Sequence, residues 1–239
     1  MQRNEPAPGK LAEPLPSTFK DRKEDGDHLK IWNLPNQLTV ARLALSVIFF
    51  VLLGIETHVS FYPGKISVVL NVSILVFLLA VVTDFLDGYL ARKWGLVSTF
   101  GRIADPFADK IVVCGGFVML IGVCPRLVEP WFAVVIIIRE FLVSGLRSFL
   151  ESRGVAFGAA LSGKVKMIVQ SISIPMVLLY QANFSAIPFG ARGSRVAEVL
   201  YWLTVAFLSL TLLTTITSSI EYVQRAIKLI REDIAKRSS

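Results

Sequence analysis

The chain has 239 residues, of which 54% are hydrophobic and only 18% are charged. Its mean hydropathy is +0.61 and its formal net charge is +7. A soluble domain of this size needs more polar surface than so few charged residues supply, so the composition argues against a soluble protein. Extensive disorder, collagen-like repeats and a disulfide-stapled secreted module are excluded as well. The basic excess is typical of membrane proteins with basic cytoplasmic loops.

Residues 1–30 form a polar arm that carries four prolines and many charges. No apolar run follows Met1, so we expect no secretory signal peptide. We expect the arm to be disordered or bound to the membrane surface. A membrane domain over residues 31–224 and a basic C-terminal tail over residues 225–239 are predicted to follow it.

Six apolar stretches come after the arm, and each is near the length that crosses the hydrocarbon core as a helix. They cover about residues 38–57, 66–86, 105–123, 128–150, 165–183 and 197–220. The predicted fold is therefore all-α, a polytopic membrane protein with six transmembrane helices. Basic residues are concentrated in the arm, in the second and fourth gaps and in the tail, which places both termini in the cytoplasm. Cys114 and Cys124 lie about 15 Å apart along one helix, too far for a disulfide, and are expected to be packing residues.

Charged residues within the stretches gather toward the predicted cytoplasmic ends, which indicates one polar cavity open to the cytoplasm. The sixth stretch has no charge from Val199 to Ile220 and is expected to face lipid or to pack against other helices. Four aspartates belong to the cavity, and their spacing places each pair on one helix face. These are Asp84 and Asp87 in one helix and Asp105 and Asp109 in the next. Four carboxylates in a poorly solvated cavity need positive partners, and two Mg²⁺ or Mn²⁺ ions would supply them.

Small residues flank the aspartates at Gly88, Ala91 and Gly101. They let a ligand or another helix approach closely, and plain helix packing is the alternative interpretation. Arg92 follows Asp84 by about two helical turns and can face a phosphate bound at the metals. An ordinary flanking charge at the cytoplasmic side is the alternative for Arg92.

Together these residues read Asp84-x2-Asp87-Gly88-x2-Ala91-Arg92-x8-Gly101-x3-Asp105-x3-Asp109. The pattern resembles the signature of the CDP-alcohol phosphotransferase family, with every defining position filled, and the resemblance extends over most of residues 33–230. It implies transfer of a phosphatidyl group from a CDP-linked lipid to an acceptor hydroxyl, with release of CMP. It also implies that the four aspartates hold the metals, that Asp109 is in addition the catalytic base, and that Gly88, Ala91, Arg92 and Gly101 bind the CDP-lipid.

Three cations near the predicted metal site, Arg139, Arg147 and Lys164, suggest an acceptor that carries a phosphate. Pairing of Arg139 with Glu140 or with an aspartate is the bland alternative. The segments 33–39 with Arg42, 139–147 and 163–166 resemble the branch of the family that uses glycerol 3-phosphate. That resemblance implies acceptor-phosphate binding by the three cations and gives Asn36 and Thr39 a role in the nucleotide pocket. Arg42 could equally be an interfacial anchor.

The sequence leaves several alternative acceptors and functions open. Other acceptors within the family are phosphatidylglycerol and an inositol phosphate, and a metal-ion transporter or a structural membrane protein would belong to other classes. The expected substrates are CDP-diacylglycerol and glycerol 3-phosphate, with no nucleic-acid partner. The expected location is a bacterial inner membrane, and a homodimer is expected by resemblance alone.

Overall fold

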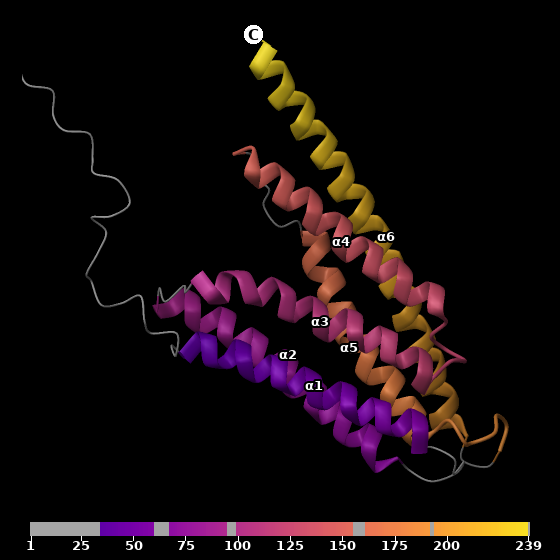
Figure 1. Cartoon of the computed structure of the whole chain (residues 1–239). Helices are drawn as coiled ribbons and strands as arrows, with labels where there is room; N and C mark the ends of the chain where they lie inside the picture. The colour runs from indigo at the N-terminus through magenta and orange to yellow at the C-terminus, as the bar shows by residue number, and fades with distance from the viewer. Residues whose placement is uncertain (1–33, 60–66, 95–98, 155–160, 192–193, 239) are drawn as a thin grey trace, which may run out of the picture. The chain divides into compact units, whose positions relative to one another are not determined.

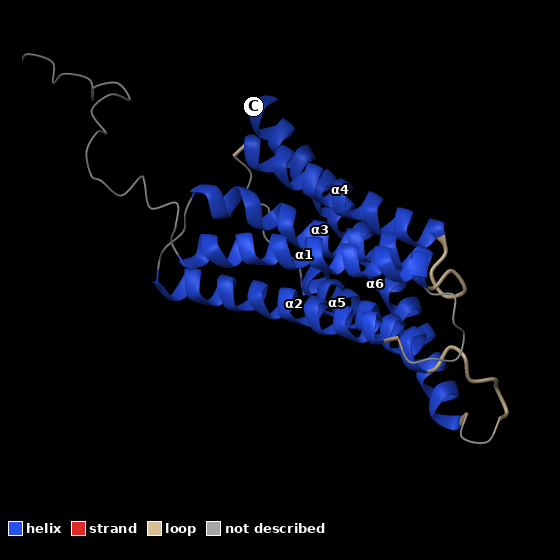
Figure 2. Ribbon diagram, turned by 60° about the horizontal axis from the view of Figure 1, so that its bottom comes forward, coloured by secondary structure: helices blue, strands red, loops and turns tan. Residues whose placement is uncertain are grey.

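The structure, a computed structural model, describes residues 34–59, 67–94, 99–154, 161–191 and 194–238. They form six α-helices, and no β-strand occurs among them (Figure 2). The side chains at 34–36, 59, 87–94, 99–106, 109, 233 and 236–238 lie outside the description. The helices are α1 (Leu34–Val59), α2 (Val68–Trp94), α3 (Thr99–Val123), α4 (Pro130–Ser152), α5 (Leu161–Asn183) and α6 (Arg195–Ser238). The all-α prediction is confirmed.

Four of these helices contain segments long and apolar enough to cross a membrane: Gln37–His58, Val68–Leu86, Leu161–Asn183 and Arg195–Glu232. The apolar part of α3 that the structure describes is shorter, Lys110–Val123. In α4 the apolar run is interrupted by Arg139, Glu140 and Arg147. The chain is therefore an integral membrane protein on these four helices. The count of six spans stays a prediction.

Helix α6 is longer than its predicted apolar stretch, and residues 225–238 continue it without a break. Its 44 residues extend about 66 Å, roughly twice the thickness of a bilayer core. The continuation is stabilised by packing, because Tyr222 and Ala226 of α6 form a buried cluster with Val143 and Leu150 of α4. Every third or fourth residue of the α6 end contributes to this face, so the end is amphipathic.

Neighbouring helices are joined by short connections, which favours antiparallel packing. Helices α2 and α5, which are not consecutive in the chain, are also antiparallel, because hydrogen bonds join the start of α2 to the end of α5. The side chains of Asn71 and Asn183 bond each other at 3.1–3.2 Å, and the Ser67 amide donates to the Ala182 carbonyl at 3.0 Å. Helix α3 contacts α1, α2, α4 and α5, which places it inside the bundle, and α6 contacts α4 and α5 (Figure 1).

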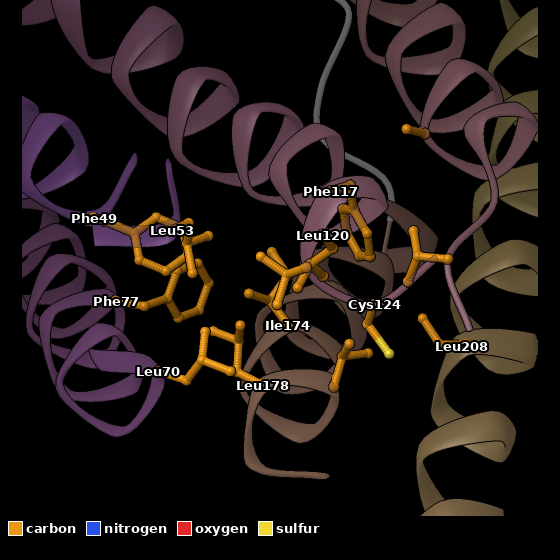
Figure 3. Packing of buried hydrophobic residues seen from close by; sticks show 14 of the residues in the cluster. Phe49, Leu53, Leu70, Phe77, Phe117, Leu120, Cys124, Ile174, Leu178 and Leu208 are labelled. Carbon is orange, nitrogen blue, oxygen red and sulfur yellow. The ribbon is translucent and has the colours of Figure 1, made fainter. Parts of the chain in front are cut away.

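The main hydrophobic core lies in one half of the bundle. Phe49 and Leu53 of α1 meet Phe77 of α2, and Phe117 of α3 packs near Ile174 of α5 (Figure 3). The ring centroids of Phe49 and Phe77 are 5.3 Å apart. Cys124 belongs to the same cluster, and both cysteines are free thiols, as expected.

The polar buried side chains lie in the other half. Along α2 the core residues precede Asp84, along α4 they precede Arg139, and along α5 they follow Lys166. Because α2 and α5 run in opposite directions, these residues fall at the same end of the bundle. The fold thus separates an apolar half from a half that can carry chemistry.

Candidate active site

The first aspartate of the signature, Asp84, pairs with a buried arginine of α1. Its Oδ1 lies 2.6 Å from Nη1 of Arg42. The Arg42 side chain is 2% exposed and that of Asp84 is 32% exposed. The antiparallel packing of α1 and α2 brings the two together, since Arg42 is near the start of α1 and Asp84 near the end of α2. Arg42 is therefore an interior residue of the bundle, which does not fit a role as an interfacial anchor.

Two more polar residues of α1 lie on the same helix face as Arg42. Thr39 is buried three residues before it, and Ser46 is buried four residues after it. The Ser46 hydroxyl donates to the Arg42 carbonyl at 2.7 Å. The predicted nucleotide-pocket residue Thr39 thus lies one turn from the arginine that holds Asp84. The side chain of Asn36 lies outside the described set.

The remaining signature residues lie on helical turns next to Asp84. Residues 87–92 continue α2, and Gly101, Asp105 and Asp109 belong to the first three turns of α3. Helices α2 and α3 contact each other and are joined by residues 95–98 only. The side chains at Asp87, Gly88, Ala91, Arg92, Gly101, Asp105 and Asp109 lie outside the description. Their geometry with Asp84 therefore stays a prediction.

The donor chemistry of this region fits a hard divalent cation. Asp84 offers a half-buried carboxylate that holds Arg42 through Oδ1, and the three other predicted ligands are also aspartates. Within the described side chains, no three acidic, histidine or cysteine residues gather at one point. Three of the four predicted ligands fall outside that set.

A second polar cluster joins α4, α5 and α6. Arg139 donates from Nη1 to Oε1 of Glu140 at 3.0 Å and from Nη2 to Oγ of Ser218 at 3.3 Å. Lys166 donates to the same Glu140 oxygen. The guanidinium carbon of Arg139 also lies 5.7 Å from the centre of the Tyr222 ring. The bland pairing of Arg139 with Glu140 therefore exists, within a larger cluster that includes a second cation.

The three predicted phosphate-binding cations have different surroundings. Arg139 is 7% exposed, Arg147 is half-buried and Lys164 is exposed. The Nε atoms of Arg139 and Arg147 are buried and have no hydrogen-bond partner among the described residues, and the same holds for the hydroxyl of Ser162 on α5. Buried donors without partners are rare and suggest a missing ligand or water. Among the described residues the structure thus leaves three buried donors of this kind, two on α4 and one on α5.

Sequence reasoning missed Lys166 and the polar face of α6. Lys166 is 4% exposed and lies two residues after Lys164, on the opposite side of α5. The α6 face consists of Thr211, Thr215 and Ser218, which bond Ser173 at 2.8 Å, Gln170 at 3.4 Å and Arg139 at 3.3 Å, respectively. Their spacing of four and three residues was the available signal, because it marks one helix face. Of the two roles expected for α6, lipid-facing or packing, the structure shows packing, and the packing face is polar.

Comparison with known proteins gives the family. A profile of the CDP-alcohol phosphatidyltransferase family matches residues 32–216. A Bacillus subtilis protein named CDP-diacylglycerol–glycerol-3-phosphate 3-phosphatidyltransferase is 34% identical over 195 residues, which cover 80% of this chain and 94% of the relative. Proteins of the same name from Rickettsia felis and Mycoplasma pneumoniae are 36% and 32% identical, and the matches cover 74% of this chain and 90% and 80% of those relatives.

The matched region includes α1 to α5 and the first half of α6, and with them every signature residue from Asp84 to Asp109. It also includes Arg139, Glu140 and Lys166, whereas Ser218 and Tyr222 follow its last residue. The shared part of the chain thus contains the apolar core and most of the polar half of the bundle. The chain belongs to the CDP-alcohol phosphatidyltransferase family.

Proposed function

We propose that this protein transfers the phosphatidyl group of CDP-diacylglycerol to sn-glycerol 3-phosphate, giving phosphatidylglycerophosphate and CMP. The observation that carries the proposal is the position of the aspartate signature. It lies on the contacting helices α2 and α3, in the same half of the bundle as a buried cationic cluster from α4 and α5. One region accounts for the donor and the other for an anionic acceptor. The names of the relatives agree with this assignment.

We infer that Asp84, Asp87, Asp105 and Asp109 hold two Mg²⁺ or Mn²⁺ ions. Bound there, such ions would neutralise the diphosphate of the donor and stabilise the leaving oxygen. The half-buried position of Asp84 supports this role, and Arg42 fixes Oδ1 of its carboxylate.

The cytidine diphosphate of the donor is proposed to lie along the small residues of α2 and α3. Gly88, Ala91 and Gly101 would permit its close approach, and Arg92 would contact a phosphate. Asn36 and Thr39 would complete the nucleotide pocket from α1. The burial of Thr39 next to Arg42 supports this part of the proposal.

In the transfer step Asp109 takes the proton of the acceptor hydroxyl. The acceptor oxygen then forms a bond to the phosphorus on the lipid side, and the bond from that phosphorus to the bridging oxygen breaks, so that CMP leaves. The role of the remaining residues is to position the two substrates and to balance their charge.

Arg139, Arg147 and Lys164 are proposed to bind the phosphate of the acceptor. The unused Nε donors of Arg139 and Arg147 support this assignment, because a phosphate oxygen would satisfy them. The unused hydroxyl of Ser162 lies one turn before Lys166 on α5 and is available to the same anion.

We further propose that all six helices cross a bacterial inner membrane with both termini in the cytoplasm and the polar cavity open to that side. The distribution of basic residues supports this orientation. Residues 1–30 would form a separate arm, and a homodimer is the proposed assembly. Light scattering of the detergent-solubilised protein tests the dimer.

An acceptor panel tests the reaction. The purified protein is incubated in detergent with CDP-diacylglycerol, Mg²⁺ and one of glycerol 3-phosphate, inositol phosphate or phosphatidylglycerol, and CMP and lipid products are measured. Only glycerol 3-phosphate is expected to give a product, and EDTA is expected to abolish it. A product with inositol phosphate alone would refute the proposed acceptor. Metal flux through sealed vesicles without CMP release would indicate a transporter instead.

A further inference from the structure

We infer that Glu140 and Lys166 are positioning residues that set the charge and direction of Arg139 for an anionic acceptor. The inference rests on the proposed function and adds to it two residues that the acceptor site does not yet include. It starts from the shared hydrogen bonding of the cluster, in which Oε1 of Glu140 accepts from both Arg139 and Lys166.

The first argument is charge. Arg139 and Lys166 contribute two positive charges and Glu140 one negative charge, so the cluster carries a net charge of one positive unit. The three side chains are 8%, 6% and 12% exposed, respectively, so water compensates this charge poorly. A buried uncompensated cation favours an anion in contact with it. The cluster is therefore matched to a ligand that brings negative charge.

The second argument is direction. A guanidinium has five N–H donors in a fixed plane. Glu140 takes one from Nη1 and Ser218 takes one from Nη2, while the Tyr222 ring lies against the group. These contacts leave Nε buried and without a partner. The plane of Arg139 is thus fixed from three directions. Glu140 and Ser218 use two of its five N–H donors, and the buried Nε–H has no partner among the described side chains.

The third argument is location. Helix α3 contacts both α4, which carries Arg139 and Glu140, and α5, which carries Lys166. Asp109 belongs to the third turn of the same helix α3. The cluster consequently lies near the helix that carries the proposed base, as a site for the second substrate requires.

Lys166 has a specific task in this arrangement. Without it, the Glu140 carboxylate would neutralise Arg139 alone, and the cluster would lose its net charge. With it, Glu140 can hold Arg139 in place while one positive charge remains for the ligand. The lysine and the glutamate therefore act as a pair, and the number of charges matters more than either residue alone.

The test is a charge-balance series in the full-length protein. Glu140→Gln, Lys166→Gln, the double variant and Lys166→Arg are assayed for CMP release with glycerol 3-phosphate titrated at saturating CDP-diacylglycerol, and in the converse titration. Each glutamine variant is expected to raise the KM for glycerol 3-phosphate about tenfold or more, with little change in the KM for the lipid. Lys166→Gln does so because it removes the net positive charge, and Glu140→Gln because Lys166 then repels Arg139 from its position. The double variant restores one net positive charge and removes the repulsion between two cations. Its acceptor KM should return to within roughly threefold of wild type, as should that of Lys166→Arg.

Matched controls are Glu151→Gln on α4 and Lys228→Gln on α6, because both residues are exposed. They should leave both KM values unchanged. Thermal melting identifies any single variant that does not fold. In that case the acceptor KM values of Lys166→Arg and of the double variant, both expected near the wild-type value, test the inference. Unchanged KM values in the single variants, additive losses in the double variant, or equal shifts for both substrates would overturn the inference. A wild-type protein without any product from glycerol 3-phosphate would refute the proposed function instead.

Discussion

The ion pair between Arg42 and Asp84 gives a prediction that links stability to metal binding. Arg42→Gln removes the cation and leaves the Asp84 carboxylate half-buried without its partner. Loss of one partner of a fully buried pair costs about 3–5 kcal/mol, and loss of an exposed pair costs roughly 0–1 kcal/mol. Asp84 is one-third exposed, so we expect an intermediate cost of about 2 kcal/mol. In a bundle of this size that lowers Tm by roughly 4–8 °C.

The metal dependence is the discriminating part of this prediction. A divalent cation at Asp84 can replace the charge that Arg42 supplies, so Mg²⁺ should stabilise the variant more than the wild-type protein. The assay is tryptophan fluorescence during heating in detergent, with EDTA or with Mg²⁺. We expect a clear deficit in Tm in EDTA and a smaller one in saturating Mg²⁺. Arg126→Gln is the matched control, since Arg126 is exposed in the turn between α3 and α4.

Two results would refute the reasoning. If Arg42→Gln melts like the wild-type protein in EDTA, the ion pair does not contribute to stability. If Mg²⁺ raises Tm equally in both proteins, Arg42 and the metal do not act on the same carboxylate, and Asp84 is not a metal ligand.

Three further predictions concern single residues. Asp109→Asn should abolish CMP release while CDP-diacylglycerol still binds, and a near-normal rate would refute its role as base. Arg147→Ala should raise the KM for glycerol 3-phosphate far more than that for the lipid, and equal effects would move Arg147 out of the acceptor site. Burial raises the pKa of the Cys124 thiol to about 11. In a Cys114→Ser background, maleimide should therefore modify it only slowly at pH 7–8 until the protein is denatured, because the reactive thiolate is scarce below the raised pKa. Rapid modification of the folded protein would show that the thiol is accessible.

The helices themselves could be predicted because each apolar stretch is long enough to form one, and each of the six predicted stretches overlaps one observed helix. The ends were harder to predict. The end of α6 alternates basic and apolar residues, and only its contact with Val143 and Leu150 of α4 reveals that it continues as a packed helix. A tail and an amphipathic helical extension have the same composition.

The partners of the charged residues could not be predicted, because the spacing along a helix gives its faces but not its rotation against neighbours. Arg42 could be read as an anchor until α2 placed Asp84 beside it. Lys164 and Lys166 are equally basic in the sequence, and only the rotation of α5 within the bundle buries the second one, beside Glu140 of α4. The signature aspartates were the exception, because the pattern of Asp84, Asp87, Asp105 and Asp109 as a whole indicates that they act together.

The polar face of α6 explains how its charge-free stretch, Val199 to Ile220, can define a charged site. Helices in a membrane lack a hydrophobic driving force toward each other, so close contacts and interhelical hydrogen bonds fix their register. Thr211 bonds Ser173, and Thr215 bonds Gln170, which aligns α6 with α5 one turn at a time. A Cβ at Gly163 of α5 would lie only 3.0 Å from the Tyr222 hydroxyl of α6. This glycine therefore permits α5 and α6 to stay in close contact where the row of hydroxyl groups ends. The next members of the α6 face are Ser218 and Tyr222, which hold Arg139. The direction of the buried arginine therefore depends on a row of hydroxyl groups that hydropathy alone does not distinguish from the lipid-facing side of the same helix.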